Sequence, residues 1–353
     1  MPYGGWKTLT ISRPMIDRLQ PRYGLMLEIM PGVLACVAIA LATTFVADHY
    51  GGPTMLYALL FGMALHFLSE EARFLPGVEF ASRTVLRLGV ALLGVRITAG
   101  QVLGLGPVPV LTVVAAVAST IVAGAVLARL MGLERDLGLL TGGAVAICGA
   151  SAAIALAAVM PRRGPGERDL ILTVVGVTTL STVAMVTYPA LAGVLGLDHA
   201  QAGVFLGGTI HDVAQVVGAG YIISPETGDV AALVKLMRVA MLVPAVLCFT
   251  LLFRRDRGGA REVGATPALP AFLVAFVVLV LANSAGLVPG ALAAGLDGLS
   301  RWCLVTAVAG LGVKTSLQKL AVVGWRPVAV MVGETLFLLL LVLGAVLSVG
   351  VGR

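Results

Sequence analysis

The sequence has little charge for its length. Only 12% of its 353 residues are Asp, Glu, Lys or Arg, whereas ordinary soluble domains carry about a quarter. The hydrophobic residues make up 59% of the chain and its mean hydropathy is +1.01. Apolar runs follow one another with only short polar breaks, so no stretch remains for a sizeable soluble domain. An ordinary soluble protein is excluded, and an integral membrane protein is expected.

Cysteine and histidine are also scarce, which excludes several kinds of site. The four cysteines form no C-x-x-C pair and all fall inside apolar segments: Cys36, Cys148, Cys248 and Cys303. The sequence therefore predicts neither disulfides nor a thiolate zinc site. The H-D-x-x-Q pattern that begins at His211 lacks the second histidine of a zinc protease helix. No metal and no cofactor are expected.

The net charge of +6 comes from 24 Lys and Arg residues that lie mostly between the apolar runs. In a soluble protein such an excess would indicate nucleic acid as a partner. Basic residues between membrane spans instead report the orientation of the chain, because they stay on the cytoplasmic side. The partner expected is the lipid bilayer, and no nucleic acid.

The apolar pattern predicts an all-α polytopic membrane protein with about 10–11 transmembrane segments. A cytoplasmic segment, residues 1–23, precedes a single transmembrane transporter domain, residues 24–352. The first apolar run is long and lacks a small-x-small cleavage site, so we expect a retained helix and not a signal peptide. Eleven hydrophobic segments are expected, at residues 25–47, 53–69, 84–98, 107–131, 137–160, 169–195, 201–223, 230–253, 269–288, 300–315 and 326–350.

The fifth and seventh segments, 137–160 and 201–223, are crowded with glycine, alanine and small polar residues. If the fifth segment crossed the membrane fully, the arginines of the loop 161–169 would lie outside, against the positive-inside rule. If both segments are broken or re-entrant, that loop moves inside. The loops with Arg73 and Arg83, Arg129 and Arg135, Arg254 to Arg261, and Lys319 and Arg326 are cytoplasmic in either case. We therefore expect two broken or re-entrant helices.

Internal similarity supports the same interpretation. Aligning residues 137–153 with 202–218 superimposes two Gly-Gly pairs, and LLGVRIT (92–98) resembles LGVKTS (311–316). These matches are typical of remnants of a duplication, and paired glycine-interrupted segments mark the binding site in many transporters. Alternatively, the glycines only allow tight helix packing.

His211 and Asp212 are the most unusual residues of the seventh segment. Ionisable groups at membrane depth are costly and are kept mainly for function. A titratable histidine beside a carboxylate suits the binding of a coupling proton or sodium ion. Gln215 is expected one helical turn beyond His211, on the same face. The alternative is a polar pair that bonds to freed backbone groups.

Lys235 and Arg238 lie three residues apart in the eighth segment, on one helical face. Such cations would receive an anionic substrate, the arginine through its bidentate fork. Alternatively, both side chains snorkel to the nearby surface.

Donors around the fifth segment complete the predicted anion site, since a helix N-terminus at a break attracts anions. Cys148 is more readily a packing residue than a reactive thiol. Glu334 is a weaker candidate, and Arg96 and Lys314 most simply anchor helix ends. The full set predicted to bind substrate is Thr141, Gly142, Gly143, Cys148, Gly149, Ser151, Thr209, Gln215, Lys235, Arg238 and Asn283.

Several of these motifs resemble the YeiH family of bacterial inner-membrane proteins, commonly labelled sulfate exporters. The motifs are AICGASAA (146–153), GGTIHDVAQVVGAG (207–220), KLMRVAMLVP (235–244), ANS (282–284) and LLGVRIT (92–98), and the resemblance covers about residues 25–350. Where that family carries glutamate after its histidine, this chain has the shorter Asp212. By analogy with sodium/proton antiporters and bile-acid transporters, the resemblance implies inverted repeats, broken helices and a small anion as solute.

The function expected is secondary active transport of a small anion, such as sulfate or a sulfonate, by alternating access with proton or ion coupling. A membrane-embedded enzyme with His211 and Asp212 as acid and base is the first rival, and a passive anion channel is the second. We expect no enzyme, because no nucleophile is paired with a base in the sequence. The location expected is a bacterial inner membrane, and homodimer formation stays open.

Overall fold

The computed structural model describes residues 13–104, 106–161, 166–253, 270–315 and 325–349. These residues form helices and no strand. Six helical spans are long and apolar enough to cross a membrane, and they are Leu27–Tyr50, Pro107–Leu130, Arg168–Val194, Pro225–Leu252, Gly290–Lys314 and Trp325–Ser348. The expected all-helical fold with several membrane-length helices is therefore confirmed. The arginines at 162, 163 and 254 to 261, Lys319 and the first twelve residues lie outside the described part of the chain.

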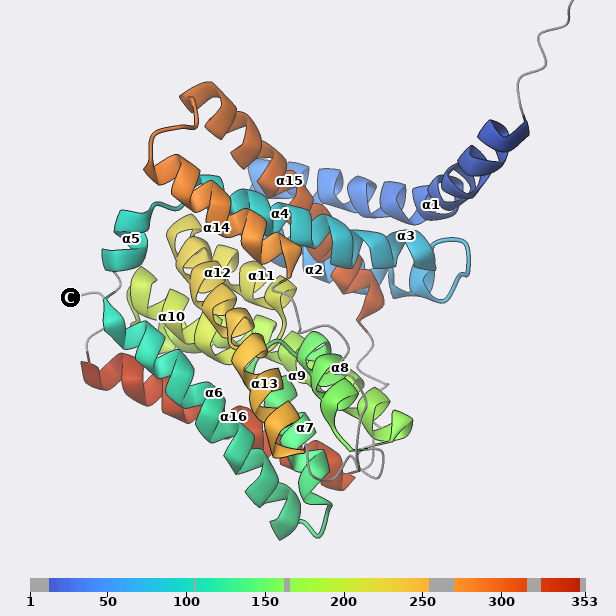
Figure 1. The fold of residues 1–353 in the computed structure, drawn as a ribbon. Coiled ribbons are helices and arrows are strands. Elements are labelled where there is room, and N and C mark those ends of the chain that lie inside the picture. Colours follow the sequence, from blue (N-terminus) through green and yellow to red (C-terminus); the bar gives the residue numbers. More distant parts are fainter. Residues whose placement is uncertain (1–12, 105, 162–165, 254–269, 316–324, 350–353) are drawn as a thin grey trace, which may run out of the picture.

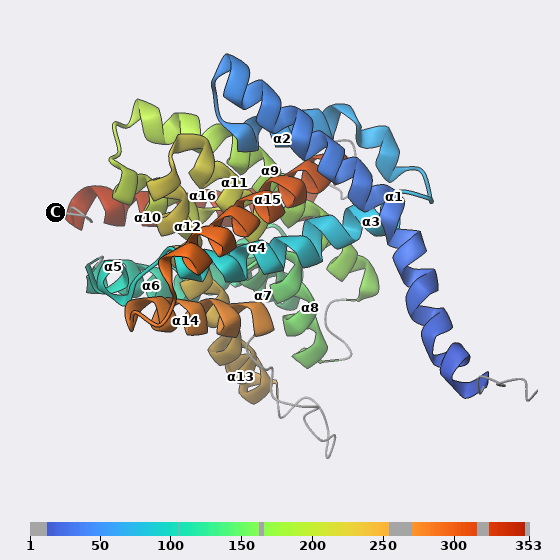
Figure 2. The same cartoon turned by 90° about the horizontal axis from the view of Figure 1, so that it is seen from above.

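One group of helices, which we call the scaffold bundle, forms the upper part of Figure 1. Its long helix α15 packs against α1, α2 and α4, and α14 packs against α4 (Figure 2). A continuous helical run passes from α3 through a π-helical turn, η2, into α4 and the short turn η3. The bounds are α1 Arg13–Tyr50, α2 Thr54–Ala64, η1 His66–Ser69, α3 Leu75–Phe80, η2 Ala81–Val85, α4 Leu86–Leu92, η3 Leu93–Val95, α14 Ala271–Ser284 and α15 Gly290–Lys314.

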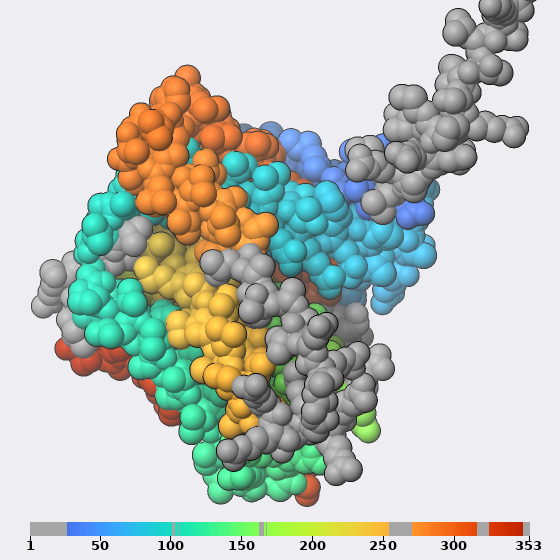
Figure 3. Space-filling view, viewed as in Figure 1, coloured from blue at the N-terminus to red at the C-terminus, as the bar shows by residue number. Residues whose placement is uncertain are grey.

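The remaining long helices form a second group, the hairpin bundle, in the lower part of Figure 1. The short helix α5 (Ala99–Gly104) leads into it, and the two bundles meet across the middle of the molecule in Figure 3. The bounds are α6 Pro107–Leu130, α7 Arg135–Ala146, α8 Ala150–Val159, α9 Glu167–Val194, α10 His199–Thr209, α11 Val213–Ile223, α12 Pro225–Ala240, α13 Leu242–Leu252 and α16 Trp325–Val349.

Glycines hold the scaffold helices close together. A Cβ atom on Gly62 of α2 would lie 2.4 Å from the carbonyl oxygen of Ala309, and one on Gly312 would lie 2.4 Å from that of Leu59. Hydrophobic burial does not drive helices together in lipid, so close backbone contact of this kind is a main source of attraction. The α2–α15 contact therefore depends on small residues at both positions.

The two glycine-rich segments are interrupted, as expected, and each folds back on itself. The first breaks between α7 and α8 at residues 147–149, and the second between α10 and α11 at residues 210–212. At the open end of the second hairpin, Nδ1 of His199 lies 3.0 Å from Oγ of Ser224 and 3.2 Å from Oγ1 of Thr227. In the first, the packing of Gly143 on Leu156 brings the two helices together.

The hairpins enter the bundle from opposite ends (Figure 1). Helix α9 connects them, and its 28 residues span about 42 Å at 1.5 Å per residue. The base of the α7–α8 hairpin and the base of the α10–α11 hairpin are therefore separated by the thickness of a membrane. Their tips meet in the middle of the bundle.

The close glycine contact between α2 and α15 gives a test of stability. Gly62→Leu should lower the free energy of unfolding by about 1–3 kcal/mol or more, because the new side chain has no room against the backbone of α15. Thermal unfolding in detergent measures this. The matched control is Gly193→Leu, at a position where a Cβ atom meets nothing within 4 Å. Equal unfolding temperatures for the two variants would contradict the proposed packing.

Candidate functional site

The first hairpin tip depends on one glycine in a left-handed conformation. Helix α7 ends at Ala146, and Gly149 with φ 63° is the residue from which α8 starts. Residues with a Cβ atom rarely adopt such a φ, so glycine favours this turn. The nitrogen of Gly149 donates to the carbonyl of Ala144 at 2.8 Å, and no side chain caps α8. The N-terminus of α8 therefore carries its partial positive charge without a carboxylate at the cap.

The second tip is built differently, because a side chain caps its outgoing helix. Ile210 and Asp212 are extended, and Oδ1 of Asp212 accepts a hydrogen bond from the nitrogen of Ala214 at 2.9 Å. The nitrogen of Asp212 lies 3.0 Å from Oγ of Ser181 on α9. Aspartate is a preferred N-cap residue because its oxygen satisfies an amide that the helix leaves free. One side of the Asp212 carboxylate is thus bound to α11.

Lys235 of α12 joins the two tips. Its Nζ donates to the carbonyl oxygens of Ile147 at 2.7 Å, of Ile210 at 3.0 Å and of His211 at 2.5 Å. The side chain is fully buried. An ammonium group has three donors, so these carbonyls use all of them.

Arg238 lies one turn farther along α12 and also donates hydrogen bonds to backbone carbonyls of both tips. Its Nε and Nη2 donate to Ala146 and Val145 at 2.9 and 2.8 Å. Its Nη1 donates to Gly207 and Ile210 at 3.1 and 3.0 Å. Four of its five donors are thus occupied, and it too is fully buried.

These contacts occupy most of the donors of the two cations that the sequence predicted to bind the solute. Lys235 and Arg238 neither reach the surface, as snorkelling requires, nor line the polar cleft described below. They bind the carbonyls left without partners where α7 and α10 end, and they offset the partial negative charge of both helix ends. The pair therefore holds the tips of the two hairpins together.

His211 and Gln215 do not share a face, contrary to expectation. Nε2 of His211 lies 3.0 Å from Oγ1 of Thr335 on α16, whereas Nε2 of Gln215 donates to Oγ1 of Thr182 on α9 at 3.0 Å. His211 stands in the extended break, so helical spacing does not relate it to a residue of α11. Both side chains are fully buried.

A polar cleft lies between the two bundles at the level of the tips. It consists of two pockets of about 310 and 260 Å³, both of which are lined by Ser82, Arg83, Ala150 and Asp212. The larger pocket adds Arg87 from the scaffold bundle and Cys148, Ser151 and Val213 from the hairpin bundle. The smaller adds Thr178, Thr179 and Thr182 of α9 and Lys314 of α15. The cleft thus joins the start of α8 to basic side chains of the scaffold.

The sequence alone did not mark several of these cleft residues as binding residues. Arg83 and Arg87 look like interfacial anchors, and nothing local shows that they face a helix N-terminus. The hydroxyl run at 178–182 was the available signal, since TTLST is unusual within an apolar span. Of the predicted set, Cys148 and Ser151 line the cleft and Gly149 forms the tip beside it.

Other predicted binding residues do not line the cleft. Gly142 fits against the carbonyl of Thr120 on α6, and Oγ1 of Thr209 donates to its own helix at Phe205. Asn283 lies near the end of α14 and does not line the cleft. The close contact of Gly142 thus favours the packing interpretation for that glycine.

Thr141 contacts another membrane-buried candidate. Its Oγ1 donates to Oε1 of Glu334 at 2.7 Å, and both residues are buried between α7 and α16. Gly124 of α6 leaves space for the same carboxyl oxygen. Glu334 therefore ties α16 to the first hairpin away from the cleft.

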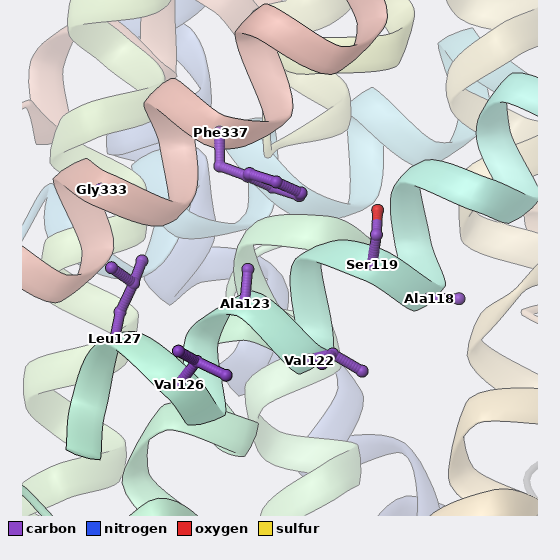
Figure 4. Close-up of a pocket in the computed structure, with 8 residues that line it drawn as sticks. All are labelled: Ala118, Ser119, Val122, Ala123, Val126, Leu127, Gly333 and Phe337. Carbon is purple, nitrogen blue, oxygen red and sulfur yellow. The ribbon is translucent and has the colours of Figure 1, made fainter. Parts of the chain in front are cut away.

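One pocket that is larger than either pocket of the cleft has no chemistry for an anion. It is a groove of about 650 Å³ between α6 and α16 (Figure 4). Its lining is apolar except for Ser119, whose hydroxyl donates to the carbonyl of Ala115 at 2.6 Å. The groove suits hydrocarbon and not a charged solute. Its lining residues are Ala118, Ser119, Val122, Ala123, Val126, Leu127, Gly333 and Phe337.

The role of Arg238 can be tested by Arg238→Lys. A single ammonium group cannot reach the four carbonyls that the guanidinium binds, so we expect a loss of about 3 kcal/mol or more in stability. Thermal unfolding in detergent is the measurement, and Arg87→Lys at the exposed side of the cleft is the control. A stable Arg238→Lys protein that lost only anion binding would contradict the role assigned here.

Comparison with known proteins places the chain in a family. The family model described as Conserved hypothetical protein 698 matches residues 24–331. A UPF0324 membrane protein of Chlorobaculum tepidum is 55% identical over 317 residues, which cover 90% of this chain and 88% of the relative. The UPF0324 membrane protein TauZ of Paracoccus denitrificans is 53% identical over 92% of this chain and 96% of its own length, and a Bordetella pertussis member is 32% identical over 91% and 92%. The chain is a multi-pass membrane protein and belongs to the UPF0324 membrane protein family, Conserved hypothetical protein 698.

Proposed function

We propose that this protein is a secondary active transporter of a small anion that works by alternating access between the two bundles. The observation that carries the proposal is the meeting of two oppositely inserted hairpins at Lys235 and Arg238, beside a polar cleft. Interrupted helices at the membrane midplane are a common way to build a transporter site, because they offer helix ends to a solute. The YeiH resemblance points to a transporter as well.

In this proposal the membrane topology follows from the hairpins. Nine segments cross the bilayer, and the α7–α8 and α10–α11 hairpins enter from the cytoplasmic and the outer side. This arrangement keeps the loop 161–169 inside, which satisfies the positive-inside rule. The cleft with Arg83 and Lys314 then opens toward the cytoplasm of a bacterial inner membrane. The two hairpins are the central elements of an inverted repeat.

The cleft favours an anion over a cation. The α8 N-terminus has no side-chain cap, and Ser151 adds a hydroxyl at its first turn. Arg83 and Arg87 line the same pocket from the scaffold bundle. Amides at a helix start and guanidinium groups are both good partners for a tetrahedral oxyanion such as sulfate or a sulfonate. The sulfate-exporter label of the YeiH family agrees with this class.

Asp212 is the best placed group to bind the coupling proton or sodium ion. It is half-buried, lines both pockets of the cleft and has one carboxylate oxygen beyond its cap contact. His211 is less suited, because charging its ring would add a third cation beside Lys235 and Arg238 in a fully buried volume. We therefore assign coupling to Asp212 and a positioning role to His211.

An enzymatic role is the weaker alternative. Nε2 of His211 contacts Thr335, and its Nδ1 has no hydrogen-bond partner in the described part of the chain. Neither Cys148 nor Ser151 is therefore paired with this base, as nucleophilic catalysis requires. A passive channel would differ in being conductive and insensitive to proton and sodium gradients.

The anion site is tested by binding and transport with purified protein. A thermal-shift screen against sulfate, sulfite, sulfonates and carboxylates identifies the solute. Arg87→Ala should then weaken its binding about tenfold, since one charge-assisted contact is lost in a partly hydrated cleft. Arg129→Ala, an exposed arginine at the end of α6, is the control. Full affinity in Arg87→Ala together with Ser151→Ala would contradict the site.

Coupling is tested by Asp212→Asn. Asparagine keeps an oxygen that can cap α11 but removes the charge, so the variant should fold and bind the anion. In proteoliposomes it should lose the response of transport to an imposed proton or sodium gradient. Gradient-driven uptake at the unaltered rate would show that Asp212 carries no coupling ion.

A further inference from the structure

A cluster of charged side chains lies at the end of the molecule opposite the cleft. Nη2 of Arg96 is 3.5 Å from Oδ2 of Asp229, and Nε of Arg96 is 3.4 Å from Oδ1 of Asp297. Tyr221 donates its hydroxyl to Oδ1 of Asp229 at 2.6 Å, and its ring centroid lies 6.0 Å from Cζ of Arg96. The cluster borders a cavity of about 280 Å³ that Arg96, Tyr221 and Asp297 help to line.

The members of this cluster belong to different bundles. Arg96 follows η3, where Gly94 lies against the backbone of α14, and Asp297 is on α15. Both are therefore fixed to the scaffold bundle. Asp229 on α12 and Tyr221 on α11 are fixed to the second hairpin, because Gly220 and Gly228 pack backbone to backbone. The Arg96–Asp229 contact thus connects the two bundles, and the Arg96–Asp297 contact does not.

Lys314 provides the comparison at the cleft end. It ends the LGVK motif that resembles the LGVR motif of Arg96, and α4 and α15 pack together. Nζ of Lys314 is 3.2 Å from Oε1 of Glu79, which is on α3 of the same bundle. Lys314 also lines the cleft, where no ion pair to the hairpin bundle is formed in the described residues. Arg96 and Lys314 therefore each have a carboxylate partner within the scaffold bundle. Of these two cations, only Arg96 has a second carboxylate partner, Asp229, in the hairpin bundle.

We propose that the Arg96–Asp229 ion pair, held by Tyr221, is the gate that closes the outer side while the cleft is open to the cytoplasm. This inference rests on the transport function proposed above. Movement of the hairpin bundle past the scaffold must separate Asp229 from Arg96, and Asp297 then remains as the partner of Arg96. The side chains of Arg96 and Asp229 are 29% and 22% exposed. Water thus reaches the pair, and a partly hydrated pair is weak enough to open in each cycle.

The gate is tested by labelling from outside, with no solute present. In a variant without native cysteines, Val305→Cys introduces a thiol in the outer cavity, where Val305 is 2% exposed. Adding Asp229→Asn should raise the rate of reaction with a membrane-impermeant maleimide about fivefold, since an ion pair that favours the closed state is lost. Asp297→Asn, which keeps the contact between bundles, should leave the rate within about twofold of the parent.

A second reporter links the gate to alternating access. A thiol introduced by Ser151→Cys lines the inner cleft and reacts with the same maleimide added from the cytoplasmic side. Opening of the outer side should slow this reaction in Asp229→Asn and also in Arg96→Gln, which removes the same pair from the scaffold side. Unchanged rates at both reporters in two folded gate variants would overturn the gate. Rates that change as expected in a protein that moves no anion would keep the gate and overturn only the assigned solute.

Discussion

The backbone carbonyls at the ends of α7 and α10 point into the middle of a membrane protein, where water cannot satisfy them. Each interrupted helix leaves such groups, and each unpaired group would cost several kcal/mol in a hydrocarbon environment. Lys235 and Arg238 satisfy these carbonyls with seven hydrogen bonds to the two tips. The carbonyls in turn stabilise two buried cations that would otherwise be unacceptable there. The helix breaks would not be stable without the two buried cations, and the buried cations would not be stable without the carbonyls that the breaks expose.

This arrangement separates the cations that hold the hairpin tips from the groups that line the cleft. The carboxyl ends of the broken helices face the fixed cations, so the amino end of α8 is free to face the cleft. An anion there would meet amides, a hydroxyl and the scaffold arginines, while Asp212 remains available for a coupling ion. A buried cation that held the solute directly would have to release the hairpin tips first. In the proposed transporter this separation would let the cleft bind and release an anion while the contacts of the hairpin tips stay intact.

The contact between the bundles differs from the contacts within them. Inside the scaffold bundle, glycines bring α2 and α15 to backbone contact, and such seams do not slide easily. Between the bundles α11 packs against α2 and α15, and a polar cleft lies at one end. At the other end a single cation of the residues described, Arg96, forms an ion pair across the bundles. Ion pairs that water reaches can be exchanged at low cost. In the proposed transport cycle the contacts within each bundle would be kept and the contacts between the bundles would change.

The sequence by itself determined that this protein lies in a lipid bilayer and which of its segments are interrupted. Its scarce charge and long apolar runs predicted a helical membrane protein, and the small residues of segments 137–160 and 201–223 predicted which segments are interrupted. It also singled out His211, Asp212, Lys235 and Arg238, because ionisable groups are rare in such a chain.

Only the tertiary structure decided what these groups touch. Lys235 and Ile147 are 88 residues apart, and Arg238 and Val145 are 93 apart. Local spacing predicted a face for both cations but not their partners. It misplaced Gln215 beside His211, because His211 lies in the break and α11 begins only at Val213. Arg87 was not among the residues that the sequence singled out, and only the fold placed it at the cleft. Composition sets the free energy of transfer into lipid residue by residue, whereas a site requires groups from several helices to meet, and only packing brings them together.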